Sequence, residues 1–158
     1  MMPDQLRRES NEELAIREYS PRDLEAMYRL DVECFDAPFR FSRRAMREFA
    51  EAPGAVTVIV ESSTEMAGFA IAHVLGGAAY MVTVDVAQSW RGRGLGRLLI
   101  EEVEHRVMGH GALSMELHVF AGNDAAQRLY RRLGYTQTGI AEDFYGGGLS
   151  GLSFRKEL

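Results

Sequence analysis

The stretch Arg91-Gly92-Arg93-Gly94-Leu95-Gly96-Arg97 lies between a strand-like run, Tyr80 to Val86, and a helix-like run that begins at Leu95. Its three glycines let backbone N–H groups approach a ligand with no Cβ in the way. The first turn of a helix has unpaired N–H groups and the positive end of the helix dipole, and both attract phosphate. The arginines add side-chain charge at the same place. This order of strand, glycine-rich turn and helix N-terminus predicts a pyrophosphate-binding loop.

Two common nucleotide loops do not fit this stretch. A Walker loop requires Gly-Lys-Ser/Thr, but the chain has one lysine, Lys156. A dinucleotide fingerprint requires a third glycine where this chain has Arg97. The stretch instead resembles the Arg/Gln-x-x-Gly-x-Gly/Ala acetyl-CoA loop of the GCN5-related N-acetyltransferases (GNAT), which it matches at Arg91, Gly94 and Gly96. Taken alone, an Arg/Gly-rich loop of this kind also occurs as a plain turn.

Length and composition limit the possible classes of protein. The 158 residues suffice for one domain, and 46% hydrophobic with 26% charged residues is ordinary globular composition. The net charge of −5 argues against nucleic acid as a partner. The single cysteine, Cys34, excludes an internal disulfide and a cysteine metal cluster, so we predict no metal site. Without a long apolar run, we expect a cytoplasmic protein that does not enter a membrane.

The pattern of apolar residues, caps and turns predicts one α/β domain at residues 14–158, preceded by a flexible tail at residues 1–13. Ser20 begins one helix, with Asp23 in a capping-box role, and Ser42 caps the next. We expect helices at 20–34, 42–49, 95–109 and 125–133, and strands at 14–19, 55–61, 66–75, 78–86, 113–120, 135–141 and 152–158. The order β-α-α-β-β-β-α-β-α-β-β implies a sheet covered on both faces.

A second motif strengthens the GNAT resemblance. Residues Leu117 to Tyr135 resemble the family pattern L-x-V-x-x-x-N-x-x-A-x-x-L-Y-x-x-x-G-F/Y. The resemblance covers nearly the whole chain from Leu14 to Leu158, and departs at Gln88, where the family often has proline. It implies the GNAT fold: a mixed, mostly antiparallel sheet of six or seven strands, splayed in the middle and flanked by four helices. It also implies acetyl-CoA as cofactor and a primary amine as acceptor.

The resemblance further implies roles on the cofactor side. The backbone of Val84 and Val86 would pair with pantetheine, residues 91–97 would hold the pyrophosphate, and Asn123 would contact the pantetheine arm. Tyr130 would donate a proton to the departing sulfur, a reasonable task for a phenol beside a leaving thiolate. From the residues alone, Asn123 is also a helix N-cap and Tyr130 a core aromatic.

A base must deprotonate the acceptor amine. His118 falls on the polar face of its strand with Ser114 and Glu116, and Tyr80 begins the partner strand. If the strands splay, Tyr80 and His118 face one gap and could share a water, and the ordinary histidine pKa of ~6.5 suits a base. A solvent-facing sheet residue is the other interpretation of His118. Glu116 is an alternative base, or a surface carboxylate paired with an arginine.

A narrower resemblance favours the histidine. Tyr80 to Thr83 and Leu117 to Val119 resemble the segments that carry the tyrosine and histidine base pair of the eukaryotic NatE-type N-terminal acetyltransferases. The bacterial ribosomal-protein alanine acetyltransferases usually carry a glutamate where His118 stands.

Two further segments resemble the acceptor side of that branch. The run Phe35 to Phe41 resembles the aromatic-proline loop that receives a peptide N-terminus, which implies substrate contacts from Phe35, Pro38 and Phe39. The segment Asp143-Phe144-Tyr145 resembles a Tyr-Tyr pair over the substrate, with Phe144 in place of one tyrosine and therefore one hydroxyl fewer. Tyr145 retains the other hydroxyl.

The sequence thus supports three hypotheses. The first is direct acetyl transfer from acetyl-CoA to the N-terminal α-amine of a protein or peptide, and the second is the same chemistry on a small-molecule amine. The third is a non-catalytic acyl-CoA-binding module, which the presence of Tyr80, His118 and Tyr130 disfavours. Cys34 could carry an acyl group, but a small buried hydrophobe fits it better. We expect a monomer or a homodimer.

Overall fold

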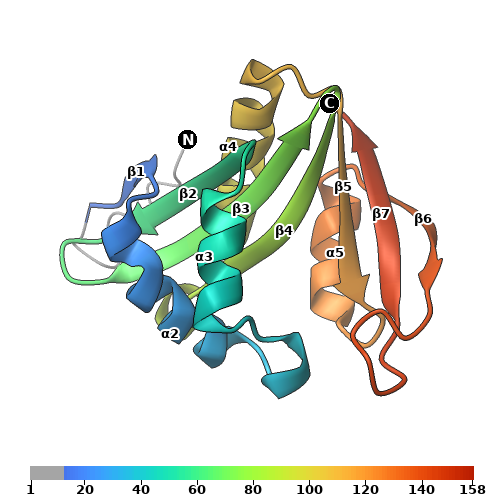
Figure 1. The fold of residues 1–158 in the computed structure, drawn as a ribbon, viewed down its shortest axis with the longest axis horizontal. Helices are drawn as coiled ribbons and strands as arrows, with labels where there is room; N and C mark the ends of the chain where they lie inside the picture. The colour runs from blue at the N-terminus through green and yellow to red at the C-terminus, as the bar shows by residue number, and fades with distance from the viewer. Residues whose placement is uncertain (1–12) are drawn as a thin grey trace.

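The structure is a computed structural model that describes residues 13–158, so the predicted tail lies outside the described residues except for Glu13. Within this range the chain forms seven strands and four α-helices in the predicted order (Figure 1). Their bounds are β1 Ala15–Glu18, α2 Leu24–Cys34, α3 Arg43–Glu51, β2 Ala55–Glu61, β3 Met66–Leu75, β4 Ala78–Val86, α4 Leu95–Gly109, β5 Ser114–Phe120, α5 Asp124–Arg132, β6 Thr136–Ala141 and β7 Gly151–Glu157. Three short 3-10 helices are η1 Pro21–Asp23, η2 Ala37–Phe39 and η3 Gln88–Trp90. The predicted fold class is confirmed.

Local signals account for most of the helix ends. The Asp23 carboxylate accepts a hydrogen bond from the Ser20 backbone N–H at 2.8 Å, although the first turn is η1 and the α-helix starts only at Leu24. Ser42 Oγ accepts from the Ala45 N–H at 3.0 Å, as expected of an N-cap. The predicted loop at Phe35 to Phe41 contains the η2 turn, since Pro38 fixes a backbone φ that a 3-10 turn tolerates.

All seven strands form one sheet in the order β1-β2-β3-β4-β5-β7-β6. Its β4–β5 pair is parallel and the other pairs are antiparallel. Helices α2 and α3 cover one face of β2–β4, and α4 covers the other (Figure 1). No helix among residues 13–158 is long and apolar enough to span a membrane.

The sheet splits between β4 and β5. Pairing runs only from Ala78↔Ser114 to Met81↔Leu117, after which β4 stays with β3 and β5 stays with β7. One extra residue in β4 at Val82 shifts the β3–β4 register at that point, and such a bulge increases local twist. The two strands therefore diverge below their short paired section (Figure 1).

Four predicted strands differ from the structure by one residue at one or both ends, and at Leu113 the difference changes the expected burial. Leu113 was expected on the buried face of a strand at 113–120, but β5 begins at Ser114 and Leu113 is 69% exposed. Its N–H donates to Gly77 O at 2.7 Å, which places it at the turn end of the sheet, beyond the core.

A buried polar cluster joins the two halves of the sheet. Glu104 of α4, which packs on the β2–β4 half, accepts hydrogen bonds from Tyr135 Oη at 2.7 Å and from Lys156 Nζ at 3.0 Å. Tyr135 directly precedes β6, and Lys156 lies in β7. Glu104 and Tyr135 are almost fully buried, so the cluster fixes β5–β7–β6 against α4.

Tyr135→Phe tests this connection. The change keeps the ring and removes the donor to a buried carboxylate, and hydrogen bonds to charged groups contribute about 1.5–3 kcal/mol. We expect the free energy of unfolding in urea to fall by about 2 kcal/mol. Tyr28→Phe, at a half-exposed position outside the cluster, is the control and should change stability by less than about 0.5 kcal/mol. Equal stability of both variants would contradict the role of the cluster.

Candidate functional site

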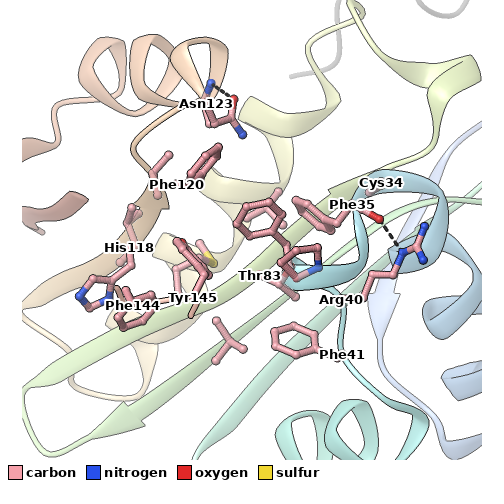
Figure 2. Close-up of a pocket in the computed structure, with 18 of the residues that line it drawn as sticks. Cys34, Phe35, Arg40, Phe41, Thr83, His118, Phe120, Asn123, Phe144 and Tyr145 are labelled. Atoms are coloured by element: carbon pink, nitrogen blue, oxygen red, sulfur yellow. Dashed lines mark hydrogen bonds between the residues drawn. The ribbon is translucent and has the colours of Figure 1, made fainter. Parts of the chain in front are cut away.

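A cavity of about 790 Å³ opens where β4 and β5 separate. Its walls come from the η2 loop, β4, β5, the start of α5 and the segment between β6 and β7 (Figure 2). Nine predicted site residues line it, from five separate parts of the chain: Phe35, Pro38, Phe39, Tyr80, Val84, His118, Asn123, Tyr130 and Tyr145. The fold therefore brings the predicted catalytic and acceptor residues together.

Tyr80 and His118 are in direct contact, with 2.7 Å between Tyr80 Oη and His118 Nδ1. Tyr80 lies in the short section where β4 still pairs with β5. His118 is the first residue of β5 beyond that section. Burial raises the pKa of Tyr80 to about 12, while burial lowers the pKa of His118 from 6.5, partly offset by Glu116. At neutral pH the phenol therefore keeps its proton and the imidazole is neutral, so Tyr80 can donate to Nδ1.

Phe144 holds the imidazole from its other side. The rings of His118 and Phe144 are stacked, with 4.1 Å between centroids and 16° between planes (Figure 2). Phe144, which lacks the hydroxyl of the tyrosine that the resemblance implies there, therefore has a packing role that the sequence did not indicate. Ser114, predicted on the same polar face as His118, is buried because β5 is paired on both edges there.

Tyr130 is a buried residue of α5 that lines the cavity. Its ring packs edge-on against Tyr135 at 5.4 Å between centroids. Burial raises the pKa of Tyr130 well above its usual 10, with a further contribution from the nearby Asp85. The phenol is therefore fully protonated at neutral pH and available as a donor.

Aromatic rings form the opposite wall. Phe39 of η2 packs against Phe120 of β5 and against Tyr145, with 4.8 Å and 5.0 Å between ring centroids. Phe41 packs against Phe49 of α3 at 5.1 Å. Sequence reasoning missed Phe120 and Phe49. Phe120 occupies an unspecified position of the second motif, and nothing in its type marks it as part of the site.

The glycine-rich loop lies outside this cavity, at the other end of β4. Gly92 and Gly94 have φ of 72° and 81°, and a Cβ at either position would meet nothing within 4 Å. The loop backbone is thus open on the side of these glycines, and the first turn of α4 follows with N–H groups that lack intrahelical acceptors. This arrangement fits a diphosphate.

Neighbouring side chains fix the loop. Arg91 Nε donates to Val86 O at 3.1 Å, and Arg97 pairs with Glu101 at 2.7 Å. Trp90 is buried, donates a hydrogen bond from Nε1 to Glu65 at 3.0 Å and has the Arg93 guanidinium over its ring, so it anchors the loop. The structure does not place Val86 or residues 91–97 in the cavity with the catalytic candidates.

Three residues have contacts that bear on their alternative interpretations. Glu116 forms a surface ion pair with Arg155 at 2.9 Å, as the sequence suggested. Asn123 Oδ1 accepts from the Ala126 N–H at 3.1 Å, which confirms the N-cap (Figure 2). Cys34 donates from Sγ to Val86 O at 3.3 Å, and burial raises the pKa of its thiol to about 11, so it is a poor nucleophile.

Comparison with known proteins agrees with this geometry. Residues 24–135 match the family model described as the Acetyltransferase (GNAT) family. The [ribosomal protein bS18]-alanine N-acetyltransferase of Salmonella typhimurium is 35% identical over 80 residues, 51% of this chain and 54% of that protein.

Two solved structures show the same fold. The ribosomal-protein-S18-alanine N-acetyltransferase of Escherichia coli has a TM-score of 0.83 at 24% identity, covering 92% of this chain and 94% of that one. Arabidopsis thaliana NAA60 in complex with acetyl-CoA has a TM-score of 0.82 at 23% identity, covering 92% and 99%. With the family model spanning most of the chain, this protein belongs to the GNAT family and is an N-acetyltransferase that uses acetyl-CoA.

Proposed function

We propose that this enzyme acetylates the N-terminal α-amine of a protein or peptide by direct transfer. The observation that carries the proposal is the Tyr80–His118 hydrogen bond in the same cavity as the η2 loop and Tyr145. Acetyl-CoA supplies a thioester whose carbonyl carbon a neutral amine can attack. The residues of the cavity must therefore hold the amine, remove its proton and assist departure of the sulfur.

Tyr80 and His118 together remove the proton. A free α-amine has a pKa near 7.7–8.0, so much of it is protonated at neutral pH. Tyr80 accepts the proton on its hydroxyl oxygen while giving its own proton to His118 Nδ1. The phenolate, which a Tyr80 pKa of about 12 disfavours, never forms. His118 then carries the charge as imidazolium and releases the proton to solvent.

Tyr130 assists the other end of the reaction. The new C–N bond forms as the C–S bond breaks, and the departing sulfur needs a proton. We assign this donation to the Tyr130 hydroxyl, which is buried in the cavity wall and always protonated at neutral pH. A hydrogen bond from the neutral phenol stabilises the negative charge that develops on the sulfur in this buried site, and a proton that Tyr130 gives up returns to it from solvent.

The charges of the cavity favour a peptide over a small polar amine. Of the described residues that line it, Asp36 and Arg40 are the charged ones. Arg40 already donates to Phe35 O at 2.6 Å and to Val32 O at 3.3 Å. A polyamine or aminoglycoside would meet few carboxylates, and a free amino acid would find no unengaged cation in this lining. A peptide N-terminus brings one amine and neutral amides, which suit the aromatic walls.

The names of the relatives support the same acceptor class. The Salmonella and E. coli proteins are named for an alanine of a ribosomal protein. This chain has His118 at the position where that bacterial branch usually has a glutamate. The proposal therefore concerns the α-amine as a class, without naming the protein that bears it.

An acceptor panel tests the proposal. We expect peptides with a free N-terminus to be acetylated with kcat/KM at least about ten times higher than free amino acids, polyamines or aminoglycosides. The same peptides with a formylated N-terminus and an internal lysine are the control and should not react. Efficient turnover of the small amines, or of the blocked peptides, would show that the acceptor class is wrong.

His118→Ala should lower kcat by about 10²- to 10⁴-fold, because a positioned general base typically contributes that much. Acetyl-CoA affinity should be unchanged. The wild-type rate should fall as the pH drops through a pKa below 6.5, since imidazolium cannot accept a proton, and this limb should be absent in the variant. His105→Ala, on the exposed surface of α4, is the control. A variant with normal kcat and an unchanged acid limb would exclude His118 as the base.

Tyr130→Phe should lower kcat by about 10²-fold or more while the Kd for acetyl-CoA, measured by calorimetry, stays within about threefold. The loss reflects the missing donor to the sulfur, because the ring remains in place. Thermal unfolding checks that the buried site is intact. Retained turnover with intact acetyl-CoA binding would require a different proton donor.

A further inference from the structure

Two aspartates are fully buried next to the site. Asp31 of α2 and Asp85 of β4 are both 0% exposed. Asp31 Oδ2 accepts a hydrogen bond from the Phe41 N–H at 2.8 Å, and Asp85 Oδ1 accepts from Thr83 Oγ1 at 2.5 Å. The remaining oxygens, Asp31 Oδ1 and Asp85 Oδ2, are buried without a donor. The two carboxyl groups also lie near each other, since each contributes to the pKa of the other and α2, which carries Asp31, packs against β4, which carries Asp85.

Among residues 13–158, no cation forms an ion pair with either aspartate. The positive groups that act on the pair are Arg40 and Arg91, whose Nε atoms donate to the backbone carbonyls of Phe35 and Val86. The other titratable neighbours, Cys34 and Tyr130, are themselves uncharged at neutral pH. Two adjacent buried carboxylates cannot both ionise without a large cost. Burial raises the pKa of Asp31, and burial together with Asp31 raises the pKa of Asp85 well above its usual range.

We propose that Asp31 and Asp85 share one proton between their two donorless oxygens, and that this hydrogen bond ties the acceptor loop to the cofactor strand. One carboxyl group holds the loop through the Phe41 N–H, and the other holds Thr83, which lines the cavity. The link joins α2 and the end of the Phe35 to Phe41 segment to β4. The aspartates are thus positioning residues for the acceptor wall, a role that rests on the proposed function, whereas the shared proton does not.

The link depends on pH in a defined direction. Because the folded-state pKa of Asp85 is raised, the stability from its proton is fully present below the unfolded value near 3.8 and is lost as the pH rises through the raised value. Above it the pair becomes two adjacent buried carboxylates that repel each other. The α2–β4 link then weakens, and the Phe41 amide loses its fixed acceptor.

Asp85→Asn separates this proposal from plain packing. The amide N–H can donate to Asp31 at every pH, its oxygen can still accept from Thr83, and the pair keeps a charge of one. Asp31→Asn is the reciprocal variant, and its amide oxygen can still accept the hydrogen bond from the Phe41 N–H. It replaces Asp85→Asn in the measurements if that variant does not fold. Glu48→Gln, on the exposed surface of α3, is the matched control for loss of a carboxylate.

The first measurements need no acceptor. At neutral pH, infrared difference spectra between wild type and Asp85→Asn should contain a protonated-carboxyl band from the wild type. The wild-type midpoint of thermal unfolding should decrease as the pH rises above 3.8 through the raised pKa of Asp85, and the Phe41 amide should lose hydrogen-exchange protection as that pKa is passed. Asp85→Asn should flatten both profiles, and Glu48→Gln should follow the wild type. The absence of the band together with parallel profiles would overturn the shared proton.

The kinetic measurement tests positioning. With the best acceptor of the panel, KM for the acceptor should rise with pH in the wild type and stay constant in Asp85→Asn, while KM for acetyl-CoA is the same in both. An acceptor KM with the same pH dependence in both proteins would overturn the positioning role. If the panel shows that peptides are not acceptors, the proposed function fails, and the spectroscopic and unfolding results still decide the shared proton.

Discussion

The early end of the β4–β5 pairing is the constraint on which the site depends. Beyond Met81 and Leu117 these neighbouring strands part, and each keeps only its outer partner. Backbone N–H and C=O groups that face such a gap need partners. An extended ligand with amide groups, such as the pantetheine of acetyl-CoA, can supply them. The split also exposes His118, the first residue of β5 beyond the pairing, beside Tyr80.

A gap of this kind is useful only if both of its walls are rigid. One wall belongs to a half-sheet packed between α2, α3 and α4 (Figure 1). The other is tied to α4 through Glu104, Tyr135 and Lys156, the chain's one lysine. The catalytic candidates therefore lie on strands and a helix that are fixed independently of any ligand, which is the arrangement that precise placement of reacting groups requires.

Burial keeps the three catalytic candidates uncharged at neutral pH. The phenols of Tyr80 and Tyr130 have raised pKa values and the imidazole of His118 a lowered one, and in all three burial is the main cause. Proton transfers between neutral groups cost less in such surroundings than the creation of isolated charges.

The sequence by itself determined the order of the elements, most of their ends and the location of the glycine-rich loop. Those features depend on local rules: Ser42 caps its own helix, and Gly92 and Gly94 adopt positive φ wherever the loop is placed. The motifs also named nine of the residues that line the cavity. Asp85 interrupts an apolar run between Val84 and Val86, whereas Asp31 is one of several charged residues of its helix, and nothing local indicated that the two pair.

Only the tertiary structure decided which of these residues touch. Tyr80 and His118 are 38 positions apart, and Phe39 meets Tyr145 across more than half the chain. Such contacts depend on strand order, register and the bulge at Val82, which are set by packing of the whole sheet. The wrong placement of Leu113 has the same origin. Its alternation with Met115 suggested a buried strand position, but its backbone N–H donates to Gly77 O in a turn and its side chain is exposed. Local patterns fix conformation, and the distances at which chemistry occurs follow from how distant segments pack.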